Sequence, residues 1–402
     1  MSLDKASRGV GRRQLLIGGA VAAVGAAAAV GADRLDLGGD EVLVDAHGRE
    51  TVRFHGAHQP GIAITPQAHQ SLVAVQLDPG TGRDDVRRLL SVLTDDARAM
   101  MAGKPALADP EPEFARIPAR LTVTFGFGPG LVRIVRGAQD VPAWLGPLPA
   151  YPIDRLREEW SGGDLLLQVA SDDQVTVAHA VRMLVKDTRS FGTVRWHQAG
   201  FRRAYGSEKP GTTMRNLLGQ VDGTVNPRPG DASFADVVWR DDDWLAGGTT
   251  MVVRRIEMLQ DDWDRLDRHG RELSVGRTLD VGAPLTGTRE HDEPDFDATT
   301  PVGFPVIPEF SHIRRARSDD PTQVMFRRGY NYDLGPRGEM ASDAGLIFTC
   351  FQRDLEHQYL PIQARLAELD LLNQWTVPIG SAVFAIPPGA AEGEFVGEKM
   401  FG

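Results

Sequence analysis

The sequence predicts an α+β protein built from two halves with similar plans, and three observations lead to this prediction. Short apolar or alternating segments, typical of strands, recur along the chain from residue 70 onward. Between them lie segments with the apolar spacing of amphipathic helices. The chain has 402 residues, of which 42% are apolar and 25% charged, which is ordinary for a globular protein with a sizeable core. This length favours two or three domains.

The first half is expected to alternate strands and helices in a recognisable order. A helix is predicted over residues 82–103, because Val86 and Leu89 begin a run of apolar residues at helical spacing that ends at a glycine. A second helix is predicted over residues 173–188, where Asp173 can cap the first turn. Strands are predicted at residues 70–78, 120–128, 164–173 and 193–203. The order strand, helix, strand, strand, helix, strand is that of ferredoxin-like folds.

A similar order of elements returns in the second half. Strands are predicted at residues 249–259, 344–354 and 380–388, with helices at 260–270 and 354–370. A loop-heavy stretch rich in proline runs from residue 276 to 329, and a structureless segment of that length is usually functional or disordered. No strong sequence repeat relates the halves, so their similarity depends on element order alone.

Charge and cysteine content exclude several classes of protein. The formal net charge of −11 argues against a general nucleic-acid binder, which needs a basic face to neutralise phosphates. Cys350 is the single cysteine, so the chain can form neither an intrachain disulfide nor a zinc site with several cysteines. Because Cys350 lies in an apolar strand, we expect it to be a small buried hydrophobic residue.

The amino terminus has the features of an export signal. Basic residues that include Arg12 and Arg13 precede an uncharged Ala/Gly/Val stretch, and small residues at 30–32 suit a cleavage site. The pair Arg12-Arg13 followed by leucines resembles the twin-arginine signal. We therefore expect residues 1–32 to be a signal peptide read by the twin-arginine translocation machinery, with an extracellular or cell-envelope destination. The alternative is a membrane anchor, which the Gly and Ala content disfavours.

The segment LLGQVDGTVNPRP, residues 217–229, places a lone carboxylate in a tight turn. Asp-Gly is a common turn dipeptide, so the ordinary explanation is structural. The functional explanation is that Gly219 and Gly223 bring the backbone close to a flat ligand, toward which Asp222 is directed.

Two further segments carry candidate functional residues. In PEFSHIRRARSDD, His312 stands before Arg314, Arg315 and Arg317, although a lone histidine is more often structural than a ligand. In VMFRRGYNYD, two arginines follow an apolar run, and the ordinary interpretation is a strand edge with solvated side chains.

Taken together, these segments resemble one haem family. MRNLLGQVDGTVNP, VGRTLDVGAPLTG, FSHIRRARS, FRRGYNYD and GLIFTCFQRDLE occur in this order and are similar to the dye-decolourising peroxidases, especially their exported bacterial branch. HQPGI, residues 58–62, also resembles that branch. The resemblance covers nearly the whole chain after the signal. A single motif is weak evidence for the family, but five motifs in the same order are specific for it.

The resemblance implies a fold, a cofactor and site residues. The family fold is two ferredoxin-like domains, each an antiparallel sheet with packed helices, of the dimeric α/β-barrel type. They are expected here at residues 33–212 and 213–402, with one haem b held non-covalently, mostly by the second. His312 matches the histidine that ligates the iron, and the basic cluster beside it suits haem propionates. The positions that match the family's haem pocket are Gly219, Asp222, Gly223, Thr224, His312, Arg314, Arg328, Leu346 and Phe348.

By resemblance, Asp222 and Arg328 are the catalytic pair on the peroxide side of the haem. A carboxylate can shuttle the proton of hydrogen peroxide, and an arginine stabilises developing negative charge. An aspartate with a pKa near ~3.9 stays ionised in mild acid, whereas a histidine near ~6.5 does not, so activity should favour acid pH. Leu346 and Phe348 match the apolar wall of this pocket.

One departure from the family is expected near the last strand. The exported branch usually offers an acidic residue to the axial histidine, and this sequence has Asn373 and Gln374 in that stretch. A neutral acceptor would leave the imidazole less anionic.

The function expected from the resemblance is a secreted haem peroxidase that oxidises dyes, phenols or lignin-like aromatic compounds with hydrogen peroxide. The alternative is a haem-handling or iron-acquisition protein that uses the same pocket. A third reading, a secreted α+β binding protein without haem, requires all five motifs to be coincidental. Thiolate ligation by Cys350 is a further alternative to His312.

Overall fold

The computed structural model describes residues 47–402, which form one compact unit. The expected signal peptide, residues 1–32, lies outside the described residues. Within the part that is described, the search for a helix long and apolar enough to cross a membrane finds none.

The first half contains four strands and three α-helices. Its strands are β1 (His69–Leu77), β2 (Thr122–Phe127), β3 (Leu165–Ser171) and β4 (Gly192–Phe201). Its helices are α2 (Arg83–Met101), α3 (Pro129–Arg136) and α4 (Gln174–Thr188). As expected, Asp173 caps α4, because its side chain accepts a hydrogen bond from the backbone of Thr176.

The second half has shorter helices and longer connections. Its strands are β5 (Thr249–Met258), β6 (Phe326–Arg327), β7 (Tyr330–Asp333), β8 (Ala344–Gln352) and β9 (Thr376–Ile386). Its helices are α5 (Phe234–Val238), α6 (Gln260–Asp264), α7 (Arg268–Val275), α8 (His312–Ala316) and α9 (Leu360–Leu369), the last preceded by a π-helical turn at Leu355–Tyr359. Short 3-10 helices lie at His47–Arg49, Pro112–Arg116, Ala138–Asp140, Glu158–Trp160, Asp243–Leu245, Leu371–Gln374 and Glu398–Phe401.

The strands of the two halves have the same order and close on each other. The sheet order is β5-β9-β2-β3-β1-β4-β7-β8-β6, and β5 also pairs with β8, so the sheet returns to its start. In each half, the fourth strand pairs with the first, the first with the third, and the third with the second. The resulting orders are β4-β1-β3-β2 and β9-β5-β8-β7. This is the ferredoxin-like arrangement twice. The halves join through one residue pair on each side, Phe127 with Ala385 and Phe201 with Asn331.

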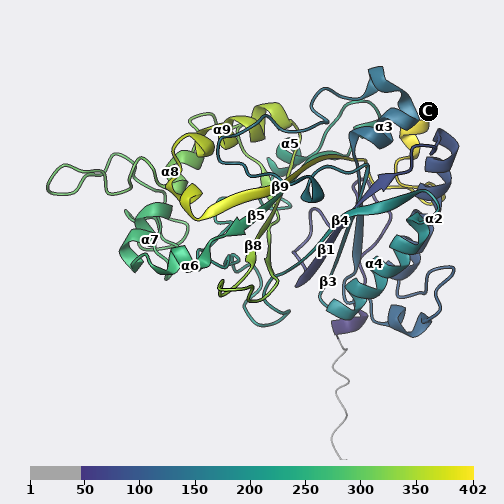
Figure 1. Ribbon diagram of the computed structural model, residues 1–402, viewed down its shortest axis with the longest axis horizontal. Coiled ribbons are helices and arrows are strands. Elements are labelled where there is room, and N and C mark those ends of the chain that lie inside the picture. Colours follow the sequence, from purple (N-terminus) through teal and green to yellow (C-terminus); the bar gives the residue numbers. More distant parts are fainter. Residues whose placement is uncertain (1–46) are drawn as a thin grey trace, which may run out of the picture. The chain divides into compact units, whose positions relative to one another are not determined.

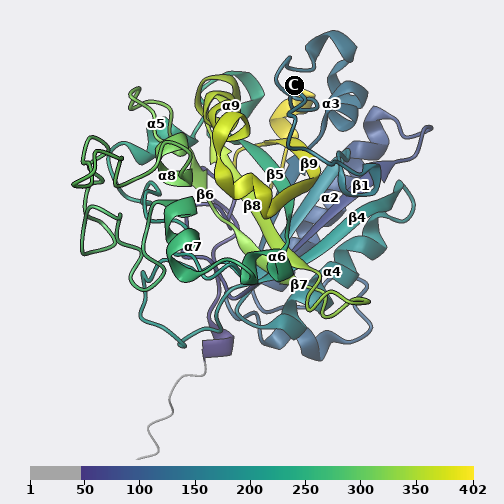
Figure 2. The same cartoon turned by 60° about the vertical axis from the view of Figure 1, so that its left-hand side comes forward.

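Helices cover the outside of this closed sheet, and a shared core fills its inside. In Figure 1, α2 and α4 lie along the strands of the first half, while α6–α9 lie at the other end of the molecule; Figure 2 shows the second half turned forward. Because side chains alternate along a strand, one face of each strand contributes to the interior. The interior core joins both halves through residues that include Leu72, Trp196, Val253, Ile347 and Phe384.

The structure confirms the expected fold class and refines several elements. The helix expected at 260–270 is two short helices, α6 and α7, since Asp267 caps a new helix. The stretch from 276 to 329, expected to be loop, contains α8 and β6. The domain boundary between residues 212 and 213 stays a prediction.

Candidate active site

Asp222 lies in the tight turn that the sequence suggested. Gly219 and Gly223 have φ angles of +82° and +130°, in the region that favours glycine. The backbone N–H of Asp222 donates to Met214 (2.8 Å), and Asn216 Nδ2 lies 3.4 Å from Asp222 Oδ2. Asn216 Oδ1 also accepts from two backbone N–H groups of the turn. The turn therefore holds the carboxylate from several sides.

A second acidic residue fastens this turn at its base. Glu290 Oε1 accepts hydrogen bonds from Thr213 Oγ1 (2.5 Å) and from Thr224 Oγ1 (3.0 Å). Thr213 and Thr224 flank the turn, so one carboxylate oxygen joins its two ends. Arg215 closes the other side, because its Nη1 donates to the carbonyls of Gly219 (3.0 Å) and Leu279 (2.6 Å).

His312 is the first residue of α8 and is oriented by a buried carboxylate. Its Nδ1 lies 2.6 Å from Asp370 Oδ2, and Asp370 is 4% exposed at its side chain. The backbone N–H of Leu371 donates to Phe310 (2.9 Å), which brings the two segments together. The other ring nitrogen, Nε2, has no hydrogen-bond partner in residues 47–402. Burial lowers the pKa of His312 and the Asp370 carboxylate raises it, and the net shift is upward.

The expectation that Asn373 or Gln374 would face His312 is wrong. Asn373 Nδ2 donates instead to the carbonyl of Leu366 (2.8 Å). Asp370 caps the 3-10 helix Leu371–Gln374 through Oδ1 and reaches His312 through Oδ2. An acidic partner is therefore present, three residues earlier than the sequence suggested.

The arginine beside Asp222 is Arg327, where the sequence indicated Arg328. Arg327 Nη1 lies 3.3 Å from Asp222 Oδ1. Asn226, in the segment that follows the Asp222 turn, exchanges two hydrogen bonds with the backbone of Arg327, at 2.7 and 2.9 Å. The expected position of Arg328 at the Asp222 carboxylate is thereby corrected by one residue.

Arg328 points in a different direction and is fully buried. Its guanidinium donates to the carbonyls of Ile62 (3.4 Å) and Ile64 (2.5 Å) and to Gln67 Oε1 (2.8 Å), all in the first half. Burial lowers its pKa to about 10. Neighbouring residues of an extended segment point to opposite faces, so an error of one position exchanges the two arginines.

His312 lies near both Asp222 and Arg327. The charges of these two residues shift the pKa of His312 in opposite directions, so all three groups are close enough to interact. The side chain of His312 is 35% exposed, so part of the ring remains open to a ligand. The structure therefore brings an imidazole, a carboxylate and a guanidinium into one region.

Apolar residues of β8 and its neighbours form the wall of this region. Leu346 is buried and Phe348 is half-buried, and both belong to a cluster with Met258, Trp263 and Trp375. The helices α8 and α9 contact each other, and neither makes an extensive contact with a strand. The side chain of Ile362 in α9 belongs to the apolar core that includes Val252 of β5 and Cys350 of β8.

Arg314, an expected haem-binding residue, and Cys350, the alternative iron ligand, have different surroundings. Arg314 Nη1 donates to the carbonyls of Phe296 (2.8 Å) and Ile307 (3.1 Å), so it closes the base of the long loop before α8. Its contact with a haem propionate stays a prediction. Cys350 is fully buried, and burial raises the pKa of its thiol, which favours the neutral form over a thiolate ligand.

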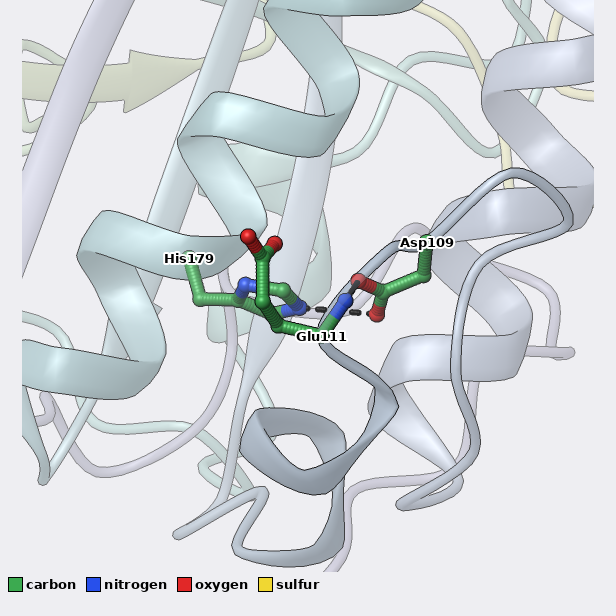
Figure 3. A group of neighbouring side chains, drawn as sticks. All are labelled: Asp109, Glu111 and His179. Carbon is green, nitrogen blue, oxygen red and sulfur yellow. Dashed lines mark hydrogen bonds and ion pairs between the residues drawn. The ribbon is translucent and has the colours of Figure 1, made fainter.

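A separate group in the first half has residue types that bind metals. Asp109, Glu111 and His179 each offer one atom within 4.8 Å of the others, and Figure 3 shows the His179 ring directed at the Asp109 carboxylate with Glu111 beside it. His179 Nε2 already pairs with Asp109 Oδ2 (2.9 Å). Arg182 Nη2 lies 2.6 Å from Glu111 Oε2, so a cation already neutralises this carboxylate. We treat the group as a structural ion-pair cluster.

Comparison with protein families decides what this arrangement is. Residues 59–202 match the family model described as "Dyp-type peroxidase, N-terminal", and residues 213–391 match "Dyp-type peroxidase, C-terminal". The chain belongs to the Dyp-type peroxidase family. Enzymes of this family are haem-dependent peroxidases, and this chain is one of them.

Individual relatives cover most of the chain. It is 37% identical over 360 residues to a dye-decolorizing peroxidase of Thermobifida fusca, covering 86% of this chain and 84% of that protein. It is 34% identical over 402 residues to a deferrochelatase of Escherichia coli K12, covering 95% and 94%. A crystal structure of a DyP-type peroxidase from Cellulomonas bogoriensis superposes with a TM-score of 0.86 at 51% identity, covering 88% of this chain and 99% of that one.

Several residues of the site escaped sequence reasoning for identifiable reasons. Arg327 was missed because two adjacent arginines in an extended segment differ only in the face to which each side chain points. Asp370 was missed because it lies at the end of a helical segment, although an aspartate before a short helix is a recognised capping signal. Glu290 lies in the acidic stretch 289–297, which is indistinguishable from a solvated loop by its sequence.

Proposed function

We propose that the mature protein is an exported peroxidase that binds one haem b non-covalently and oxidises dyes, phenols or lignin-like aromatic compounds with hydrogen peroxide. The observation that carries this proposal is that the His312–Asp370 pair lies near the Asp222–Arg327 pair.

The donor set fits a haem held through histidine. His312 Nε2 is the nitrogen left without a hydrogen bond, while Asp370 fixes the ring through Nδ1. The sequence has one cysteine, which excludes attachment of the haem through two thioether bonds and supports a non-covalent haem b. Haem held here would supply the iron that reacts with peroxide.

The residues of the chain supply acid–base and electrostatic assistance. Asp222 accepts the proton that peroxide loses at one oxygen and returns it to the other, which is general acid–base catalysis. Arg327 keeps its charge and stabilises the negative charge that develops on the departing oxygen. Asn216 and Glu290 hold the turn, so that the carboxylate need not reorganise during the reaction. Leu346 and Phe348 exclude water from this side.

Support for export and for the aromatic substrate comes from outside the described structure. Arg12 and Arg13 precede an uncharged stretch, as in signals that export folded proteins. The Thermobifida fusca relative carries the name dye-decolorizing peroxidase. Replacing Arg12 and Arg13 by lysine should keep the protein in the cytoplasm, and normal secretion of that variant would reject the twin-arginine route.

The decisive experiment is a spectrum of the protein purified with haem supplied, before and after addition of hydrogen peroxide. We expect a Soret band that changes on addition of peroxide and recovers when a reducing dye is added. A protein that binds haem but shows no peroxide-dependent change would contradict the peroxidase assignment while leaving the haem site intact.

A second candidate function is release of iron from haem in iron acquisition. It is favoured by the 34% identity to a deferrochelatase over 95% of this chain. The two functions differ in their products. Incubation of the haem-loaded protein with and without peroxide, followed by chromatography, would give metal-free porphyrin if iron is removed and unchanged haem if the protein acts only as a peroxidase.

A further inference from the structure

Arg255 occupies a position where the fold calls for an apolar residue. It lies on β5, two positions from Val253 and four from Met251, so the three side chains share a face. Met251 and Val253 belong to the core enclosed by the two half-sheets. Arg255 is 6% exposed, which makes it a cation inside this core. A polar residue in an apolar pattern marks a functional or strained position.

Two aromatic rings enclose its guanidinium. The guanidinium carbon lies 3.6 Å from the ring centroid of Trp160 and 4.6 Å from that of Tyr332. Gly380 permits this arrangement, because a Cβ there would lie 2.5 Å from the carbonyl oxygen of Trp160 and 3.2 Å from Cβ of Arg255. The faces of the guanidinium are thus stacked. The Tyr332 hydroxyl lies beside part of its edge, and the remaining N–H donors are left for another partner.

No carboxylate neutralises this cation. Within residues 47–402 no ion pair involves Arg255, and its Nε is buried without a hydrogen-bond partner. Glu257, further along β5, pairs with Arg157 at 3.9 Å, and Asp343 pairs with Arg337 at 3.3 Å. Stacking on aromatic rings offsets part of the desolvation cost of a buried cation, but a counter-charge is the usual means of compensation.

A small cavity lies at Arg255, inside the core. Its lining is mostly apolar and aromatic, with Arg255 as its cation and Gln198 as its other polar residue, and it has room for one particle about the size of a water molecule. The lining residues are Leu72, Trp160, Trp196, Gln198, Val253, Arg255 and Ile347. A mostly apolar cavity lined by one cation and no acidic residue suits a small, weakly hydrated anion.

We propose that this cavity binds a single monatomic anion of the halide class, held by the edge of the Arg255 guanidinium. Chloride is the halide expected to occupy it in the cell. Arg255 lies opposite Ile347 in the β5–β8 pairing, whereas Leu346 and Phe348 occupy alternate positions that face the other side. The anion site is therefore behind the sheet that carries the candidate haem pocket, and the bound anion would stabilise the core that joins the halves.

The test is thermal unfolding of the haem-loaded mature protein in increasing chloride, with gluconate keeping the ionic strength constant. A ligand that binds only the folded state raises the unfolding temperature with its concentration. We expect chloride to raise the midpoint for the wild type. Arg255→Met should weaken chloride binding by at least about tenfold, as removal of a buried charged hydrogen-bond donor does. Arg157→Met, an exposed neighbour, is the matched control and should respond as the wild type does.

Equal chloride responses in the wild type and in Arg255→Met would overturn the proposal, as would no chloride response at all. If Arg255→Met does not fold, crystals of the wild type grown in bromide give an independent answer. An anomalous bromide peak beside the Arg255 guanidinium would support the site. A cavity in those crystals that holds water only would overturn it.

Discussion

The two halves share a strand order but differ in how their helices meet the sheet. In the first half, α2 and α4 contact each other and the strands directly, and an apolar core fills the space between them. In the second half, α8 and α9 contact each other, and α9 contributes Ile362 to the same apolar core. The difference teaches that the fold is a scaffold, and that function arises in the half that adds the long connections carrying Asp222 and His312.

Each half also contains a histidine–aspartate pair, and the pairs differ in what remains free. His179 lies 2.9 Å from Asp109, and its side chain is 5% exposed, so the ring is enclosed. His312 lies 2.6 Å from Asp370, and its side chain is 35% exposed, so part of the ring remains accessible. The same pair therefore serves packing in one half and, we propose, ligation in the other.

The largest effect on haem binding should come from removing His312. His312→Ala should remove most of the haem, because the ring provides the nitrogen proposed to bind the iron. Haem per folded chain, measured from the absorbance of its pyridine complex, and the Soret band report this directly.

His179→Ala is the matched control in the other half. It should lower the unfolding temperature through loss of the Asp109 contact but leave haem per folded chain unchanged. If His312→Ala kept its haem with an unaltered Soret band, the comparison between the two pairs would fail and another ligand would have to be sought.

The second largest effect concerns the rate of the peroxide reaction, which should distinguish Arg327 from Arg328. We expect Arg327→Leu to slow the first spectral change after mixing with peroxide by about 10² to 10³, the usual cost of losing a donor to a developing charge. Asp222→Ala should slow it by a similar or smaller factor, since water can partly replace a base. Arg328→Leu should leave this rate near the wild type but destabilise the protein, because Arg328 binds the first half. Stopped-flow absorbance at several pH values measures all three.

If Arg328→Leu slowed the peroxide reaction more than Arg327→Leu, the sequence-based prediction that Arg328 is the catalytic arginine would be correct. A peroxide reaction abolished by Arg328→Leu and retained by Arg327→Leu would show that Arg328 assists the chemistry from its buried position. A reaction abolished by Asp222→Ala but unaffected by Arg327→Leu would instead make the carboxylate the essential group.

A smaller effect is expected from changing the partner of His312. Asp370→Asn keeps the size of the side chain but removes its charge, so the imidazole becomes a weaker donor. We expect haem affinity to fall by about 10- to 100-fold, with the midpoint potential of the iron shifted upward. Spectroelectrochemical titration measures the potential. Asn373→Asp, at the position the sequence suggested, should leave it unchanged.

Sequence reasoning predicted the fold and the segments of the site, but not every residue in them. Apolar periodicity located β1, α2 and α4 within a few residues, because packing requires that spacing. The glycines around Asp222 predicted a tight turn, and their positive φ angles confirm it. The sequence could not predict which of Arg327 and Arg328 faces Asp222, because a strand of two residues has no alternating apolar pattern. Arg255 was missed because only the closed sheet places it in the core.

The smallest effect tests the first half, where a pair of carboxylates joins α2 and α4. Burial, and then the charge of Asp96, raise the pKa of Asp187 to about 7, and Lys186 opposes this shift. The folded protein therefore holds this proton more tightly than the unfolded chain does. Between about pH 4 and pH 7 the folded state binds more protons, so its stability falls as the pH rises.

Asp187→Asn should remove this dependence and stabilise the protein above pH 7 by about 1 to 2 kcal/mol, after allowance for solvent screening. Denaturant unfolding at pH 5 and pH 8 measures the difference between the variant and the wild type. Asp95→Asn, an exposed neighbour of Asp96, is the control and should leave the pH dependence as it is. Because haem binding belongs to the second half, neither variant should change haem per folded chain. If Asp187→Asn also released haem, the proton on Asp187 would be linked to haem binding through the core that the two halves share.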